Sequence, residues 1–271
     1  MGFMGPGSVV WFEIDTADPK AVKDFYGSLL GWSFQTVPTA DGRTYTLISA
    51  DGAPLPMGGM WEPAPGGQGE GVSLAVRSAD VDADVAHLKD LGATVVLAAG
   101  PAADGGRSAR LKDPQGTAFS VWQAPEQPPA GAGTLPKAAA GAPLPGSLGW
   151  FEIGTADLEA SKTFYADAFA WTYVHDTGVA TRTYFAAITP GDQRGSGGLA
   201  DTGQATGVKD YAAPQFVTPD VPAAVATAKK LGARVEAGPE TTAYGLTFAR
   251  LTDPRGIRFL LFSLPPQVPQ S

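Results

Sequence analysis

The sequence contains an internal duplication that spans most of its 271 residues. Residues 11–14 (Trp-Phe-Glu-Ile) return 139 positions later as residues 150–153. The stretch Arg-Leu-x-Asp-Pro-x-Gly at 110–116 returns 140 positions later at 250–256. Because the spacing between the copies changes by only one residue along the chain, coincidence is a poor explanation. A chain of this kind is expected to fold as two copies of one structural module.

The boundaries of the two modules follow from composition. We predict a first module at 1–124 and a second at 148–271. The segment between them, 125–147, is nearly all Pro, Ala and Gly and has no hydrophobic periodicity, which is typical of a linker.

Each module is itself built from two similar halves. Four aspartates are predicted to cap helices at the N-terminus: Asp18, Asp80, Asp157 and Asp220. After Asp18, proline occupies a position where its missing N–H costs nothing. Val22, Phe25 and Tyr26 then mark one apolar helix face.

A strand is predicted before each helix and about three short strands after it. In the first strand, Phe12 and Ile14 face one side while Trp11 and Glu13 face the other, because strand side chains alternate. One helix per unit covers one face of the sheet and leaves the other face as a concave cup, where a ligand would bind. The predicted fold class is α+β, with four βαβββ units that form two modules with curved mixed β-sheets.

Composition excludes several classes of function. The chain has no cysteine, so thiolate metal sites and thiol nucleophiles are impossible, and a cytoplasmic location is expected. Its net charge is −8 without a basic cluster, so we expect no nucleic-acid or membrane partner. We expect a monomer or weak homodimer.

The paired βαβββ units, the Phe-Tyr pair in the capped helix, the Leu-Gly-Trp at its end and the late Asp-Pro-x-Gly turn resemble the vicinal oxygen chelate (VOC) superfamily. This superfamily includes glyoxalase I, bleomycin-resistance and fosfomycin-resistance proteins, methylmalonyl-CoA epimerase and extradiol dioxygenases. The resemblance covers nearly the whole chain outside the linker and the termini. It implies a small-molecule site in each cup, and in the enzymes of the family a divalent metal held by His, Gln or Glu.

Carried over to this sequence, the metal-ligand positions of the family hold other residue types. Those positions correspond to Trp11, Ser73, Ser120, Trp150, Ala213 and Leu260. None of these side chains is a good ligand for a hard or borderline divalent ion. The two histidines, His87 and His175, fall at unrelated places in the two modules. We therefore predict no metal and no cofactor; the alternative is a divalent metal on carboxylates near Glu13 or Glu62.

The candidate ligand-binding residues are those expected to face the two cups. They are Trp11, Glu13, Tyr45, Met60, Ser73, Ser120, Trp122, Trp150, Glu152, Tyr184, Gln215, Leu260 and Phe262. Trp32 and Trp171 are expected in the core instead. Glu13 and Glu152 are the candidate catalytic bases, but we favour a structural role in which each bonds to backbone or to a tyrosine.

These observations favour a metal-free protein, not an enzyme, that binds a small, planar and largely apolar organic molecule and sequesters an antibiotic or secondary metabolite. We expect the first cup to bind better, because its residues are more polar than those of the second. Two alternatives stay open. One is a VOC-type lyase, isomerase or oxygenase that uses a cup carboxylate with or without a metal; the other is a scaffold with vestigial cups.

Overall fold

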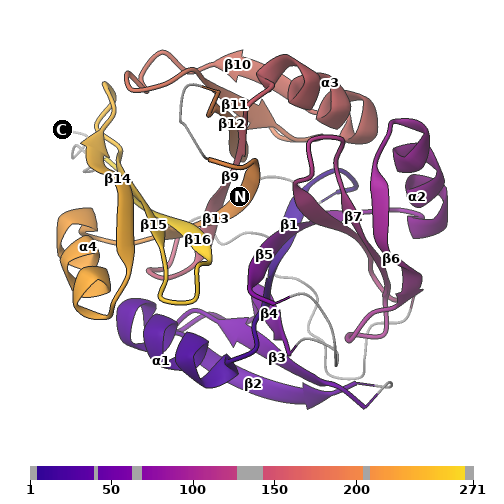
Figure 1. The fold of residues 1–271 in the computed structure, drawn as a ribbon, viewed down its shortest axis with the longest axis horizontal. Coiled ribbons are helices and arrows are strands. Elements are labelled where there is room, and N and C mark those ends of the chain that lie inside the picture. The colour runs from indigo at the N-terminus through magenta and orange to yellow at the C-terminus, as the bar shows by residue number, and fades with distance from the viewer. Residues whose placement is uncertain (1–4, 40–41, 63–68, 127–142, 204–207, 266–271) are drawn as a thin grey trace.

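The computed structural model describes residues 5–39, 42–62, 69–126, 143–203 and 208–265. Within these residues the chain forms two eight-stranded mixed sheets and four helices (Figure 1). The elements of the first module are β1 (Val9–Asp15), α1 (Pro19–Leu30), β2 (Ser33–Pro38), β3 (Thr44–Ser49), β4 (Gly58–Trp61), β5 (Gly71–Arg77), α2 (Val81–Asp90), β6 (Thr94–Pro101), β7 (Arg107–Lys112) and β8 (Ala118–Gln123). Those of the second are β9 (Leu148–Thr155), α3 (Leu158–Phe169), β10 (Thr172–His175), β11 (Tyr184–Ile188), β12 (Gly197–Asp201), β13 (Tyr211–Val217), α4 (Val221–Lys230), β14 (Arg234–Thr241), β15 (Thr247–Thr252) and β16 (Arg258–Ser263).

The two sheets have the same topology. Their strand orders are β2-β3-β4-β1-β5-β8-β7-β6 and β10-β11-β12-β9-β13-β16-β15-β14. The first strands of the two halves, β1 and β5, pair antiparallel at the centre, and each also pairs in parallel with the last strand of its own half. The predicted fold class and the four βαβββ units are confirmed. Most of the predicted linker, 127–142, lies outside the described residues.

All four helices begin at the predicted aspartates. The Asp18 carboxylate accepts a hydrogen bond from the Ala21 N–H at 3.0 Å, and Asp157 accepts one from Ala160 at the same distance. Such bonds satisfy N–H groups that lack a partner within the helix. Helix α1 ends at Gly31, whose φ of 69° is left-handed and suits glycine.

The convex faces of the sheets and the helices share one core across both modules. Helix α1 lies beside α4, and α2 lies beside α3 (Figure 1). Phe12 of the first module contacts Phe216 of the second with ring centroids 5.2 Å apart. Trp32 and Trp171 are buried in this core, as predicted. Each donates its indole N–H to a backbone carbonyl just before the other module's first strand, Trp32 to Gly146 at 2.8 Å and Trp171 to Gly7 at 2.7 Å.

The Asp-Pro-x-Gly turns also join the modules. Asp113 accepts hydrogen bonds from the Thr117 N–H at 2.7 Å and from the Tyr165 hydroxyl of the other module at 2.9 Å. In the equivalent turn of the second module, the Asp253 carboxylate lies next to Tyr26. Burial and this carboxylate raise the pKa of the Tyr26 phenol. The sequence predicted these turns as structural; in addition they position one module on the other.

The longest helices among the described residues, α1 and α3, have 12 residues each. None of the described helices is long and apolar enough to cross a bilayer.

Candidate functional site

A tryptophan and a glutamate project from the central strand of each sheet into its cup. They are Trp11 and Glu13 on β1, and Trp150 and Glu152 on β9. In each module a tyrosine from the third strand reaches across a glycine on the fourth strand and meets the tryptophan. A Cβ atom at Gly198 would lie 2.2 Å from the Tyr184 hydroxyl, so only glycine leaves this space.

The first cup is held together by hydrogen bonds among its own side chains. The Tyr45 hydroxyl accepts from the Trp11 indole at 3.0 Å and donates to Glu13 at 3.3 Å. The Trp61 indole donates to the same glutamate at 3.2 Å, and its ring lies 4.5 Å from that of Tyr45. Arg110 binds the remaining oxygen of Glu13 at 3.1 Å. Aromatic side chains therefore occupy the middle of this cup.

The second cup holds its glutamate with arginine. Glu152 is 1% exposed, and Arg182 binds its two oxygens at 3.0 and 2.6 Å. The Tyr211 hydroxyl donates to the same carboxylate at 2.6 Å, and Arg250 lies 3.4 Å from it. Both oxygens of Glu152 thus have charged or phenolic partners. This arrangement agrees with the structural role favoured from the sequence.

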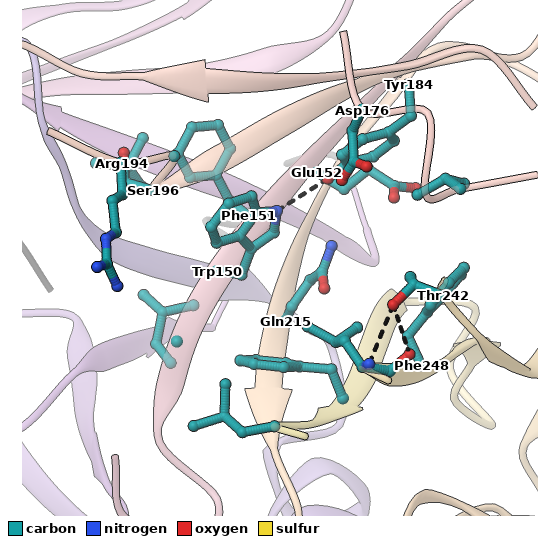
Figure 2. Close-up of a pocket in the computed structure, with 18 of the residues that line it drawn as sticks. Trp150, Phe151, Glu152, Asp176, Tyr184, Arg194, Ser196, Gln215, Thr242 and Phe248 are labelled. Carbon is teal, nitrogen blue, oxygen red and sulfur yellow. Dashed lines mark hydrogen bonds between the residues drawn. The ribbon is translucent and has the colours of Figure 1, made fainter. Parts of the chain in front are cut away.

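A cavity of about 560 Å³ lies in the second cup (Figure 2). Its walls include Trp150, Tyr184, Phe248 and Phe262, and Gln215 projects between Trp150 and Phe248. At its mouth, the exposed Tyr244 donates a hydrogen bond to Asp176 at 2.8 Å. This hydrogen bond and burial raise the pKa of Tyr244 to about 12. A cavity of this size with aromatic walls is suited to a small organic molecule.

The position of this cavity is opposite to the expectation that the first cup is the better site. The two cups differ at one pair of equivalent positions on the fourth strands. Trp61 is opposite Tyr45 in the first module, whereas Ala200 is opposite Tyr184 in the second. The Trp61 indole of the first cup therefore corresponds to the Ala200 methyl group in the second.

Met60 was predicted to line the first cup, and this is wrong. It is paired with Ile14 on β1, is 1% exposed and packs in the core. The error is a shift of one residue, which turns a strand side chain to the other face. Trp61, the next residue, is the one that faces the cup.

The other predicted residues divide into three groups. Five line the cavity: Trp150, Glu152, Tyr184, Gln215 and Phe262. Trp11, Glu13 and Tyr45 form the first-cup network described above. Four others are placed outside the cavity: Ser73, Ser120, Trp122 and Leu260. Leu260 packs with Tyr211 and Ala213, and Trp122 donates to Asp104 at 3.0 Å.

The arginines that bind the glutamates were missed from the sequence. Arg110 and Arg250 belong to the duplicated motif that was used to find the repeat, and both reach the central glutamate of their cup. Because the arginine and the glutamate both recur in the repeat, the sequence offered a signal for their pairing. Arg182 also lies in a repeated stretch, since Arg43-Thr44-Tyr45 returns 139 positions later as Arg182-Thr183-Tyr184. Tyr211 belongs to no repeated motif.

The residues at the family's metal positions do not suit a divalent cation. Ser73, Ala213 and Leu260 all lie on the cup faces, as expected from the alignment with the family's metal-ligand positions. Their partners on the neighbouring strands are Glu13, Glu152 and Gln215, respectively. They offer a hydroxyl or no donor at all. The described residues contain no group of three or more His, Cys, Asp or Glu placed to hold a metal ion. The nearby carboxylates, Glu13 and Glu152, are bound to arginine.

Two family models match the chain, one in each module. Residues 11–122 match a glyoxalase-like domain, and residues 147–261 match the glyoxalase/bleomycin resistance protein/dioxygenase superfamily. Among similar proteins, the anthracycline biosynthesis protein DnrV of Streptomyces peucetius is 29% identical over 96% of this chain and 94% of its own length. The putative glyoxylase CFP32 of Mycobacterium tuberculosis is 28% identical over 96% of each chain.

Solved structures show the same fold at low identity. The 2,2',3-trihydroxybiphenyl 1,2-dioxygenase of Sphingomonas wittichii RW1 aligns with a TM-score of 0.62 at 15% identity, over 96% of this chain and 91% of that one. The Mn(II)-bound glyoxalase of Novosphingobium aromaticivorans aligns with a TM-score of 0.58 at 16% identity, over 95% of this chain and 82% of that one.

Proposed function

Since the chain belongs to the vicinal oxygen chelate superfamily, with two of its domains in tandem, we propose that it binds one flat, largely apolar organic molecule in its second cup, without a metal ion. The first module then acts as a scaffold. The ligand is an antibiotic or another secondary metabolite that the protein sequesters. This binding takes place in the cytoplasm.

The cavity in the second cup is the observation that carries this proposal. Three aromatic rings, those of Trp150, Phe248 and Phe262, line a space of about 560 Å³. Burying a planar apolar ligand between such rings gains about 25 cal/mol per Å² of apolar surface removed from water. Specificity then depends on a few polar groups at fixed places.

Independence from metal rests on the donor set. A hard or borderline divalent ion needs several carboxylate or imidazole ligands, and within the described residues the cavity carboxylates Asp176 and Asp192 form no such group with Glu152. The Glu152 carboxylate already binds Arg182 at 2.6 Å. Recruiting it to a metal would leave a buried arginine without its partner, which is strongly unfavourable.

The relatives support a planar ligand. Two of them are named anthracycline biosynthesis proteins and align along nearly the whole chain. Anthracyclines contain fused, flat rings, and a tetracyclic ring system is of a size that a 560 Å³ cavity holds.

Binding is favoured over the alternative of carboxylate-base catalysis. A general base needs a lone pair that can reach the substrate proton. In Glu152 the two oxygens accept hydrogen bonds from Arg182 and Tyr211 at 2.6 to 3.0 Å, so a substrate proton would compete with these partners for the carboxylate.

The test is to fill the cavity and measure binding. Leu246, on the cavity wall, is only partly buried, so Leu246→Trp adds an indole with little cost to folding. Calorimetric titration with 1,8-dihydroxyanthraquinone should give one site per chain in the unmodified protein and at least a tenfold weaker site in Leu246→Trp, or about 1.4 kcal/mol.

The matched control is Ser120→Leu, which gives the first cup the residue that the second has at Leu260. It should leave the affinity unchanged. If Ser120→Leu abolishes binding while Leu246→Trp does not, the ligand is in the first cup and the proposal is wrong.

A further inference from the structure

One amide in the second cup has no hydrogen-bond partner within the described parts of the chain. Gln215 is 6% exposed and lines the cavity. Its side chain makes no hydrogen bond with any residue that the structure describes, although an amide carries two donors and an acceptor. Leaving such a group unpaired costs free energy, so its presence between the aromatic side chains of the cavity calls for a ligand or water as partner.

The Tyr184 hydroxyl is the second polar group of the cavity with unused hydrogen-bonding capacity among the described residues. Its hydroxyl accepts a hydrogen bond from the Trp150 indole at 2.9 Å. The equivalent Tyr45 also donates, to Glu13 at 3.3 Å, but Glu152 is engaged by Arg182 and Tyr211 instead. Over the described parts of the chain, the Tyr184 O–H therefore has no acceptor.

The two groups flank one aromatic surface. Trp150 on β9 is opposite Gln215 on β13. The Trp150 indole N–H contacts Tyr184, which reaches over Gly198 of β12 from the other side. Figure 2 shows the Gln215 amide between Trp150 and Phe248. A flat ligand lying on Trp150 would have the phenol at one edge and the amide at the other.

We propose that Gln215 and Tyr184 select the ligand by its uncharged oxygen substituents: the Tyr184 hydroxyl donates to a ring carbonyl, and the Gln215 amide binds a hydroxyl next to a carbonyl. This inference rests on the proposed function and names its ligand class, hydroxylated quinones or aryl ketones. The amide both donates and accepts, which matches a neighbouring hydroxyl and carbonyl. The charged groups closest to them, Glu152 and Arg182, are paired with each other, so they leave the recognition of oxygen substituents to Gln215 and Tyr184.

The first cup lacks this pair. Ala75 occupies the place of Gln215, since both are opposite the cup tryptophan of their module. The unpartnered Ser73 hydroxyl is sealed from solvent, whereas the Gln215 amide lines an open cavity. Selection by oxygen substituents is thus a property of the second cup alone.

The experiment compares two probes on three proteins. The probes are 1,8-dihydroxyanthraquinone and unsubstituted anthraquinone, and the proteins are the unmodified chain, Gln215→Leu and Tyr184→Phe. The unmodified protein should bind the dihydroxy probe about tenfold more tightly than anthraquinone, which corresponds to one or two net hydrogen bonds. Gln215→Leu should bring this ratio below about threefold while leaving the affinity for anthraquinone nearly unchanged.

A second readout separates ligand recognition from a structural role. Gln215→Leu removes an unpaired polar group from an apolar cavity, so the ligand-free variant should be at least as stable to urea as the unmodified protein. A lower unfolding midpoint would mean that the amide supports the fold, and it would overturn the inference. Ser120→Ala in the first cup is the control and should change neither ratio nor midpoint.

The outcomes distinguish this inference from the proposed function. If both probes bind in the second cup but Gln215→Leu keeps the tenfold preference and Tyr184→Phe leaves the affinity for both quinones unchanged, the selection by these residues is wrong and the binding function stands. If neither probe binds the unmodified protein, both are overturned.

Discussion

At the scale of single residues, the central glutamates are neutralised by different partners in the two cups. Glu13 is held by Tyr45, Trp61 and Arg110, and Glu152 by arginines and a tyrosine. The sequence identified both glutamates as cup residues, and the structural role favoured for them stays a prediction. It did not identify the partners, because these come from strands up to about a hundred residues away and their approach depends on the sheet order.

The Arg182–Glu152 pair should be sensitive to the loss of one member. Arg182→Met leaves a carboxylate that is 1% exposed with weaker compensation, so we expect a loss of about 3 kcal/mol in the free energy of unfolding by urea. Lys20→Met, which breaks a solvent-exposed pair with Asp24, is the control and should leave the unfolding midpoint unchanged. Equal effects of the two variants would contradict this account of Glu152.

The same residue tests the catalytic alternative. Glu152→Gln keeps the size of the side chain and removes its charge. We expect the affinity for the planar probe to change less than about threefold, because the carboxylate bonds to protein groups and not to ligand. A loss of turnover by orders of magnitude on any substrate would instead identify Glu152 as a base.

At the scale of elements, helices were easier to predict than strands. The four aspartate caps and the apolar face of α1 determine where helices begin and which side they bury, since both signals are local. The sequence did not determine which side chains of the short strand β4 face the cup, because four residues give little alternation to fix the register. Met60 was therefore assigned to the first cup, where the structure places Trp61 instead.

The turn that contains Asp113 connects its module to α3 and should respond to pH. Burial raises the pKa of Asp113 above its usual value, while bonds from Thr117 and Tyr165 oppose this. The folded protein therefore holds this proton more tightly than the unfolded chain does. The stability it contributes is present below the unfolded pKa of about 3.8 and is lost as pH rises through the folded pKa.

Asp113→Asn keeps an acceptor and removes the titration. Compared with the unmodified protein, the variant should gain in relative stability between pH 4 and pH 7, as measured by urea midpoints at the two values. Asp51→Asn, at an exposed carboxylate, serves as the control. A difference between Asp113→Asn and the unmodified protein that does not vary with pH would contradict the raised pKa.

At the scale of the whole molecule, the duplication predicted two modules but not how they pack. Phe216 contacts Phe12, Tyr26 and Trp32 of the other module, and backbone carbonyls of each module accept from the other's tryptophan. Contacts between modules are not encoded by periodicity within either one. The repeat therefore predicts the two modules, whereas the core that they share is seen only in the structure.

A shared core should make the chain unfold as one unit. Phe216→Ala opens a cavity between the modules and should cost about 3–5 kcal/mol, while the transition stays single and coincides by tryptophan fluorescence and far-ultraviolet circular dichroism. Two separate transitions, in this variant or in the unmodified protein, would show that the modules are energetically independent.

The central claim is that the second cup binds a planar molecule without a metal. The most direct measurement is a calorimetric titration of EDTA-treated protein with 1,8-dihydroxyanthraquinone, repeated after addition of one equivalent of Mn²⁺. The account predicts one ligand per chain with the same dissociation constant in both titrations. Binding that appears only after the metal is restored, to a protein that retains one ion per chain, would contradict it.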